Sequence, residues 1–214
     1  MKAITEFMDK TSDGGWSMVD RVMVAETIGS FMPNLNLPPL SFKNVTFERC
    51  KVSPGTAWLG RNVYLNDVRF IEFDCGDALR IDLDTFAVNV TVSGKKFPKN
   101  FRVRARDSGL KQDVPVDVMR FDLSNYWGNV EIYGLPLSAL RLDFTRHLFF
   151  DARAFYSADP TDVSLAWKSI AHTALSAPGS CAVFSLPKPK SKYYEGEMRD
   201  LRVLRALNVV QFDE

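Results

Sequence analysis

The chain has 214 residues, 46% of them apolar, and its 27 lysines and arginines nearly balance its 26 aspartates and glutamates. A chain of this length and apolar content can bury a sizeable core, which excludes an intrinsically disordered protein. The formal net charge of +1 provides no overall field to attract nucleic acid, so nucleic acid is not favoured as a partner.

The cysteines and the apolar segments exclude further classes. Cys50, Cys75 and Cys181 lie far apart and form no C-x-x-C pair, which argues against a zinc site or a disulfide framework. We therefore expect no metal and no cofactor. The chain shows no signal-peptide pattern and no apolar run near the roughly 20 residues that a membrane span needs. These features predict a cytoplasmic chain that does not insert into a membrane.

Residues 1–37 are predicted to form an N-terminal helical segment. Trp16, Val19 and Met23 recur at helical spacing with charged residues between them. The prolines from Pro33 onwards end any helix, because proline lacks the backbone donor and restricts the residue before it.

A different pattern runs through residues 40–75. Apolar residues occur in pairs two positions apart, and the pairs recur at five-residue spacing with polar residues between them. This spacing resembles that of pentapeptide-repeat proteins, whose chains wind as a square right-handed β-helix. The resemblance implies that both members of each pair point inward, the pairs being Val45/Phe47, Cys50/Val52, Val68/Phe70 and Phe73/Cys75.

An internal repeat follows. Residues 80–94 (RIDLDTFAVNVTVSG) and 120–134 (RFDLSNYWGNVEIYG) align without a gap at an offset of 40 residues. The same order of apolar, arginine, apolar and charged residue also occurs between and after them, and the four frames are separated by 22, 18 and 21 residues. Such alternation is typical of strands with one buried face, and a period of about 20 residues favours one such strand per coil. The frames begin at Leu79, Phe101, Met119 and Leu140.

A mainly β fold with helical ends accommodates these repeats, and residues 38–150 are predicted to form its β domain. An irregular right-handed β-solenoid is preferred, because the five-residue spacing is unusual. The alternative is an antiparallel β-sandwich in which each copy of the repeat forms a hairpin around turn residues such as Asp84-Thr85 and Ser124-Asn125.

Residues 151–214 are predicted to form a C-terminal helical segment that packs on the β domain. A helix is expected over about residues 160–177, bounded by proline-containing start and stop signals. A short strand is expected at residues 181–184, and a last helix over about residues 195–210. Helices in this position would cover an open end of the β stack, which otherwise exposes unpaired backbone groups.

No residue pattern specifies a catalytic chemistry. His147 and His172 are interpreted as structural, since neither has a second histidine at metal-ligand spacing. Cys50 and Cys75 occupy apolar positions of the repeat, where cysteine behaves as a small hydrophobic residue. The sequence lacks a G-x-S-x-G nucleophile motif and a phosphate-binding glycine loop, so it favours a protein without enzymatic activity.

Two kinds of residue are candidates for a binding surface. Three of the four repeat frames place an arginine two positions before an aspartate, on the outward side of a strand. This predicts either a solvated ladder of opposite charges or a surface for an acidic partner. Aromatic residues outside the core positions are the second kind, because aromatic side chains are favoured in binding hot spots. The candidates are Arg80, Arg102, Arg120, Arg141, Trp58, Tyr126, Trp127 and Tyr133.

These features predict a protein-binding module, such as an inhibitor or an immunity-type protein that occludes another protein. One alternative is a viral or phage assembly subunit that self-associates through a β-sandwich. Another is a carbohydrate-binding or carbohydrate-active β-solenoid that uses Asp82 and Asp122. A homo-oligomer is compatible with the sequence.

Overall fold

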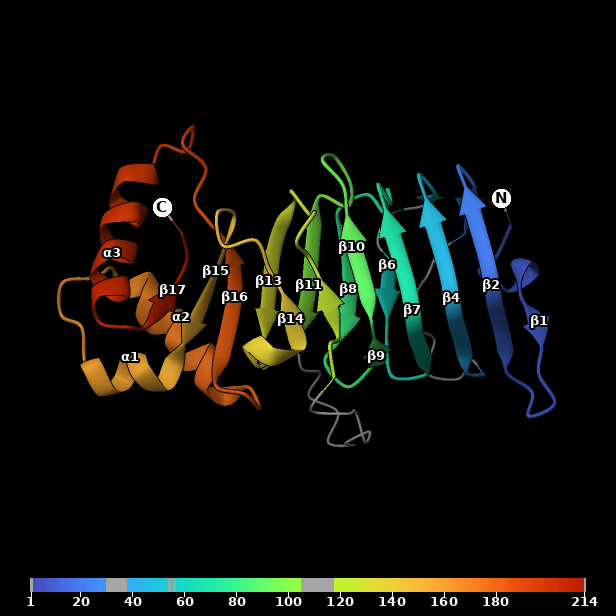
Figure 1. Ribbon diagram of the computed structural model, residues 1–214, viewed down its shortest axis with the longest axis horizontal. Coiled ribbons are helices and arrows are strands. Elements are labelled where there is room, and N and C mark those ends of the chain that lie inside the picture. The colour runs from blue at the N-terminus through green and yellow to red at the C-terminus, as the bar shows by residue number, and fades with distance from the viewer. Residues whose placement is uncertain (1, 30–37, 54, 56, 105–117, 214) are drawn as a thin grey trace.

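The computed structural model describes residues 2–29, 38–53, 55, 57–104 and 118–213. The described chain is mainly β and winds as a solenoid of about four turns, with helices at one end (Figure 1). Strands of successive coils lie side by side and are mostly parallel, which confirms the predicted solenoid and excludes the antiparallel sandwich. Parallel pairing follows from the winding, because each coil returns to the same wall in the same direction.

An eight-stranded sheet, the first sheet, forms one wall of the solenoid. All of its described strands pair in parallel except the first two, which are antiparallel. In order across the sheet they are β1 (Asp9–Lys10), β2 (Trp16–Val24), β4 (Leu40–Glu48), β7 (Val63–Ile71), β10 (Val90–Ser93), β12 (Phe121–Asp122) and β14 (Leu140–Arg141), with β9 (Phe86–Val88) also paired with β7.

A seven-stranded sheet, the second sheet, forms the opposite wall. Its first four strands are parallel, and the last three are added by antiparallel pairing. In order they are β6 (Ala57–Leu59), β8 (Ala78–Asp82), β11 (Asn100–Arg104), β13 (Asn129–Tyr133), β16 (Cys181–Ser185), β15 (His147–Asp151) and β17 (Val210–Gln211). A small parallel sheet of β3 (Thr27–Ile28) and β5 (Lys51–Val52), and the 3-10 turns η1 (Ile4–Phe7) and η2 (Leu137–Ala139), complete the solenoid.

Asparagine and aspartate occupy one bend of the first four coils. Asp20, Asn44, Asp67 and Asn89 have φ angles of 52°, 52°, 54° and 53°, the left-handed region that these two residue types tolerate best. The Asn44 amide donates to Asp20 Oδ1 at 2.8 Å, and the Asn89 amide donates to Asp67 Oδ1 at 3.0 Å. The intervals of 24, 23 and 22 residues between these positions give the coil length, which is longer than the predicted period of about 20.

The paired apolar residues of the five-residue pattern point inward, as the sequence predicts. Val45/Phe47, Cys50/Val52, Val68/Phe70 and Phe73/Cys75 are all 2% exposed or less. The Phe47 and Phe70 rings stack between neighbouring coils, with centroids 5.4 Å apart and planes at 7°. Stacked rings and close-packed aliphatic side chains therefore hold the coils together.

The predicted N-terminal helix is wrong, because β2 occupies residues 16–24. Within residues 2–29 the only helical element is the single turn η1. Met18 and Met23 point inward, five positions apart, while Val19 is exposed. Pairing of β2 with β4 satisfies the backbone along its length, so the tertiary neighbour overrides the helix-like spacing of Trp16, Val19 and Met23. Residues 30–37 of this prediction lie outside the described ranges.

The two copies of the internal repeat do not occupy equivalent places. The first copy begins in β8 of the second sheet, whereas the second copy begins at β12 of the first sheet. The first copy ends in β10 of the first sheet, whereas the second copy ends in β13 of the second sheet. An offset of 40 residues therefore relates opposite walls of the solenoid, because it is not a whole number of coils.

The C-terminal segment contains the predicted helices and strand, together with two elements that were not predicted. Helix α2 (Leu165–Ser176), strand β16 and helix α3 (Tyr194–Ala206) lie close to the expected positions, and α1 (Ala152–Ala158) and β17 are additional. The helices pack on the outer face of β15 and β16 through a second core that includes Phe150, Trp167 and Leu201 (Figure 1). None of the helices in the described part of the chain is both long and apolar enough to cross a membrane.

Candidate binding surfaces

The four predicted arginines do not form one column. Arg80 and Arg102 are register partners on the outer face of the second sheet. Arg141 lies on the first sheet, where it pairs with Asp122 at 3.4 Å. Arg120 precedes β12 and is buried. The column is split because the repeat alternates between the walls.

Arg120 is a structural residue, which corrects its assignment to a binding surface. Its side chain is 4% exposed, and its two terminal nitrogens donate to the carbonyl oxygens of Leu83 at 3.0 Å and Thr85 at 2.7 Å. Burial lowers the pKa of the guanidinium to about 10, opposed by the charge of Asp84. Its position between backbone carbonyls keeps it from contacting a partner.

Both tyrosine candidates are also buried. Tyr126 is 0% exposed and donates its hydroxyl to the carbonyl oxygen of Pro98 at 2.9 Å. Burial raises the pKa of that hydroxyl. Tyr133 packs edge to face against Phe184 at 5.6 Å, beneath the C-terminal helices. Their aromatic rings therefore contribute to the two cores instead of an exposed surface.

Trp58, Arg80, Arg102 and Glu131 form one row across the outer face of the second sheet. The Arg102 Nε lies 3.4 Å from Glu131 Oε2, and Arg104 also forms an ion pair with Glu131. This row is a ladder of mixed charge, as one of the two interpretations of the sequence predicts, but its acid is Glu131 instead of Asp82. Among the described residues, Arg80 forms no ion pair.

Asp82 is withdrawn from the charge ladder by Trp58. The indole Nε1–H donates to Asp82 Oδ1 at 2.7 Å, and Asp82 is only 7% exposed. Arg80 and Asp82, two residues apart on β8, share a face of the strand, but Arg80 is exposed whereas Asp82 is buried. The tryptophan of β6 and the aspartate of β8 thus form a contact between coils.

Trp127 is the aromatic candidate that remains well exposed, at 52%. The Arg146 guanidinium lies 4.4 Å from the centre of its ring, and the Lys95 ammonium lies 5.9 Å from it. Both distances permit attraction between a cation and an aromatic face. We call Trp127, Lys95 and Arg146 the Trp127 cluster.

The Glu72 carboxylate fixes the loop that carries Lys95. It accepts the backbone N–H groups of Lys95 at 2.7 Å and of Lys96 and Phe97 at 3.1 Å each. These hydrogen bonds lower the pKa of Glu72 against the raising effect of its burial, which is the largest single influence. Arg146 is fixed in turn by Asp143, at 2.6 Å. Glu72 therefore fixes the backbone of the loop beside Trp127, and Asp143 fixes the Arg146 side chain.

The buried histidine and the cysteines have structural environments. His147 is 1% exposed, and its Nδ1 accepts the backbone N–H of Asp143 at 3.4 Å. Burial, and then the charge of Arg146, lower its pKa to about 4. Burial raises the pKa of the Cys75 thiol to about 12 and that of Cys181 to about 11, which suppresses the reactive thiolate. In the described ranges, no three His, Cys, Asp or Glu side chains gather as a metal site.

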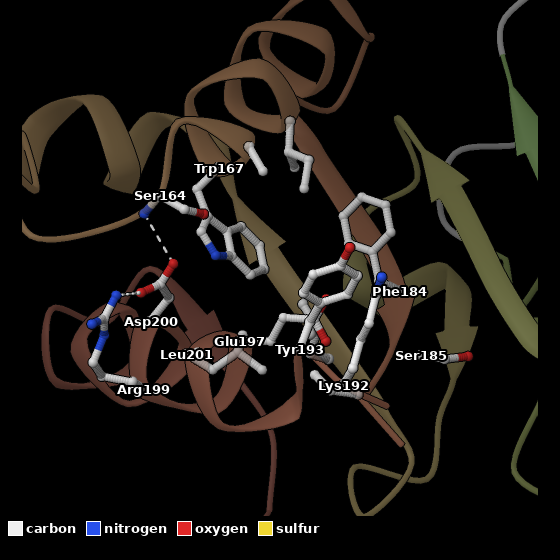
Figure 2. Close-up of a pocket in the computed structure, with 15 residues that line it drawn as sticks. Ser164, Trp167, Phe184, Ser185, Lys192, Tyr193, Glu197, Arg199, Asp200 and Leu201 are labelled. Atoms are coloured by element: carbon white, nitrogen blue, oxygen red, sulfur yellow. Dashed lines mark hydrogen bonds and ion pairs between the residues drawn. The ribbon is translucent and has the colours of Figure 1, made fainter. Parts of the chain in front are cut away.

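Sequence reasoning missed a pocket of about 590 Å³ between β16 and the helices α2 and α3 (Figure 2). Trp167, Phe184 and Tyr193 contribute aromatic rings to its lining. Asp200 also lines it and is 3% exposed. Its Oδ2 accepts the Ser164 N–H at 2.9 Å, and its Oδ1 lies 3.1 Å from Arg199 Nη2. The apolar periodicity of α2 indicates that Trp167 is a packing residue. It does not indicate a pocket, because the pocket forms only where α3 packs beside α2.

In comparisons with known proteins, no protein-family model matches the chain, and no significant match was found among the curated proteins or the solved structures.

Proposed function

We propose that this protein is a non-enzymatic binding module that occludes an acidic surface of a partner protein, and that the Trp127 cluster is its main contact. The observation that carries the proposal is the exposure of Trp127 while two cations lie within cation–π distance of its ring. A large aromatic side chain fixed before binding loses little conformational entropy on association.

The charge around Trp127 supports an acidic partner. Lys95, Lys96 and Lys99 are exposed on the loop beside it, and Arg146 adds a fourth cation at the ring. Lys96 and Lys99 form no ion pair with a described residue. Such an arrangement would steer an acidic surface toward the tryptophan, with an association rate that falls as salt rises.

Occlusion of a partner protein would make this chain an inhibitor or an immunity-type protein. A rigid solenoid offers a preformed surface, so a bound partner would be blocked sterically without a conformational change in this chain. All three cysteines are free and buried, which supports action in a reducing compartment such as the cytoplasm.

The test is capture of a partner from the source cell with the full chain, beside two variant baits. Trp127→Ala should lose the partner, whereas Tyr156→Ala should retain it, because Tyr156 is an aromatic of similar exposure on α1. A partner identified in this way should bind Trp127→Ala at least about tenfold more weakly in a titration. Equal binding by Trp127→Ala and the unaltered chain would refute the role of this cluster.

A further inference from the structure

The pocket between β16, α2 and α3 has two walls that are fixed by packing on their far sides. The Trp167 ring stacks on Phe150, with centroids 5.7 Å apart and planes at 22°. The Phe184 ring packs edge to face on Tyr133 at 5.6 Å. Figure 2 shows Trp167 on one side of the pocket, with Phe184 and Tyr193 on the other. The aromatic surfaces are therefore in place before a ligand arrives.

The charges at the pocket are unequally compensated. The Asp200 carboxylate is satisfied by Arg199 and by the Ser164 N–H, so it is not available to a ligand. Glu197 also lines the pocket and is exposed, and its carboxylate forms no hydrogen bond or ion pair with a described residue. One carboxylate at the rim thus lacks a counter-charge.

The chain itself places a cation on the aromatic wall. The Lys192 ammonium lies 4.7 Å from the centre of the Tyr193 ring and forms no ion pair within the described ranges. Lys192 is exposed and follows a proline-containing connector, so its side chain can leave without disturbing a packed element. It occupies the place that the cationic group of a ligand would take.

We propose that this pocket binds a small organic cation, in which an apolar or aromatic body carries one amine or guanidinium group. The body would lie against Trp167 and Phe184, and the cationic group would contact Tyr193 and the Glu197 carboxylate. A volume of about 590 Å³ falls in the range of small-molecule sites, roughly 300–1,000 Å³. The site is separate from the Trp127 cluster and does not depend on the proposed partner.

The test uses two probes with similar bodies and opposite charges, phenethylamine and 3-phenylpropionate. Each is titrated into the full chain, and binding is followed by calorimetry and by the tryptophan indole N–H signals in NMR spectra. We expect saturable binding of phenethylamine at millimolar concentrations and at least about tenfold weaker binding of 3-phenylpropionate. Absence of saturable amine binding, or equal affinity for both probes, would overturn the proposal.

Two substitutions at exposed positions separate a cation site from an anion site. Glu197→Gln should weaken phenethylamine binding about tenfold, and Lys192→Met should strengthen it by removing the competing ammonium. Tighter binding of 3-phenylpropionate than of phenethylamine, lost in Lys192→Met and retained in Glu197→Gln, would overturn the proposal and assign the pocket to anions. Trp127→Ala is the matched control and should leave phenethylamine binding unchanged, while thermal unfolding of each variant establishes that the fold is retained.

Discussion

The Nη2 atom of Arg120 donates to the carbonyl oxygen of Thr85 across 2.7 Å, which ties the chain before β12 to the chain between β8 and β9. A second donation, to the Leu83 carbonyl oxygen at 3.0 Å, completes the connection. Arg120 occurs in the same sequence pattern as the exposed Arg80, yet it holds two stretches of backbone together inside the protein.

Replacement of Arg120 should therefore destabilise the fold. Arg120→Met keeps the apolar bulk but removes the donors to a buried and a part-buried carbonyl oxygen, and we expect a loss of about 3 kcal/mol in the free energy of unfolding. Urea unfolding measures it. Arg141→Met is the control, since Arg141 is exposed and its pair with Asp122 should contribute little. Equal small losses in the two variants would contradict the structural role of Arg120.

The alternation of amide and acid at Asp20, Asn44, Asp67 and Asn89 predicts a compensating double substitution. Asn89→Asp should cost about 1 kcal/mol, because it removes the donor to Asp67 and places two carboxylates in adjacent coils. The variant with both Asp67→Asn and Asn89→Asp restores a donor and an acceptor and should recover most of the loss. Additive losses measured by urea unfolding would show that the side chains do not interact.

Buried His147 predicts that stability decreases at acidic pH. Its folded-state pKa of about 4 lies below the ordinary value of 6.5, so the unfolded chain binds more protons between these values. Its contribution to stability is therefore present above pH 6.5 and decreases as the pH falls toward 4, by up to about 3 kcal/mol.

The contribution of His147 can be separated from that of the carboxylates. Asp143 and Glu72 have lowered pKa values and also reduce stability as they become protonated in acid. Unfolding free energies of the unaltered chain and His147→Leu are compared at neutral pH and near pH 4.5. The variant should show the smaller decrease. The same decrease in both proteins would exclude His147 as its source.

The anchoring of the Lys95 loop by Glu72 predicts a local change in dynamics. Glu72→Gln removes one of the two carboxylate acceptors and the negative charge, so the amides of Lys95, Lys96 and Phe97 should exchange with solvent about tenfold faster. Hydrogen exchange measured by NMR tests this, with amides of β4 as internal controls. Unchanged exchange at all three amides would show that other contacts hold the loop.

Local patterns in the sequence determine the coil interior and the C-terminal helices. The pairs Val45/Phe47 and Val68/Phe70 are buried as their spacing predicts, because residues two positions apart on a strand point to the same face. Helix α2 is found where its apolar stripe and its flanking prolines place it. Such features depend on residues that are close in the sequence, so the spacing of apolar residues predicts them.

Only the tertiary structure decides how the coils are stacked. Trp16 to Val24 has a helix-like spacing, yet it forms a strand because β4 pairs with it at every position except Asp20. Arg80 and Arg120 occur in the same sequence pattern, but 40 residues separate opposite walls, so one is exposed and the other buried. The pocket beside Trp167 depends on helix α3 returning against β16. Each of these outcomes is set by contacts between residues distant in sequence, whose register no local pattern specifies.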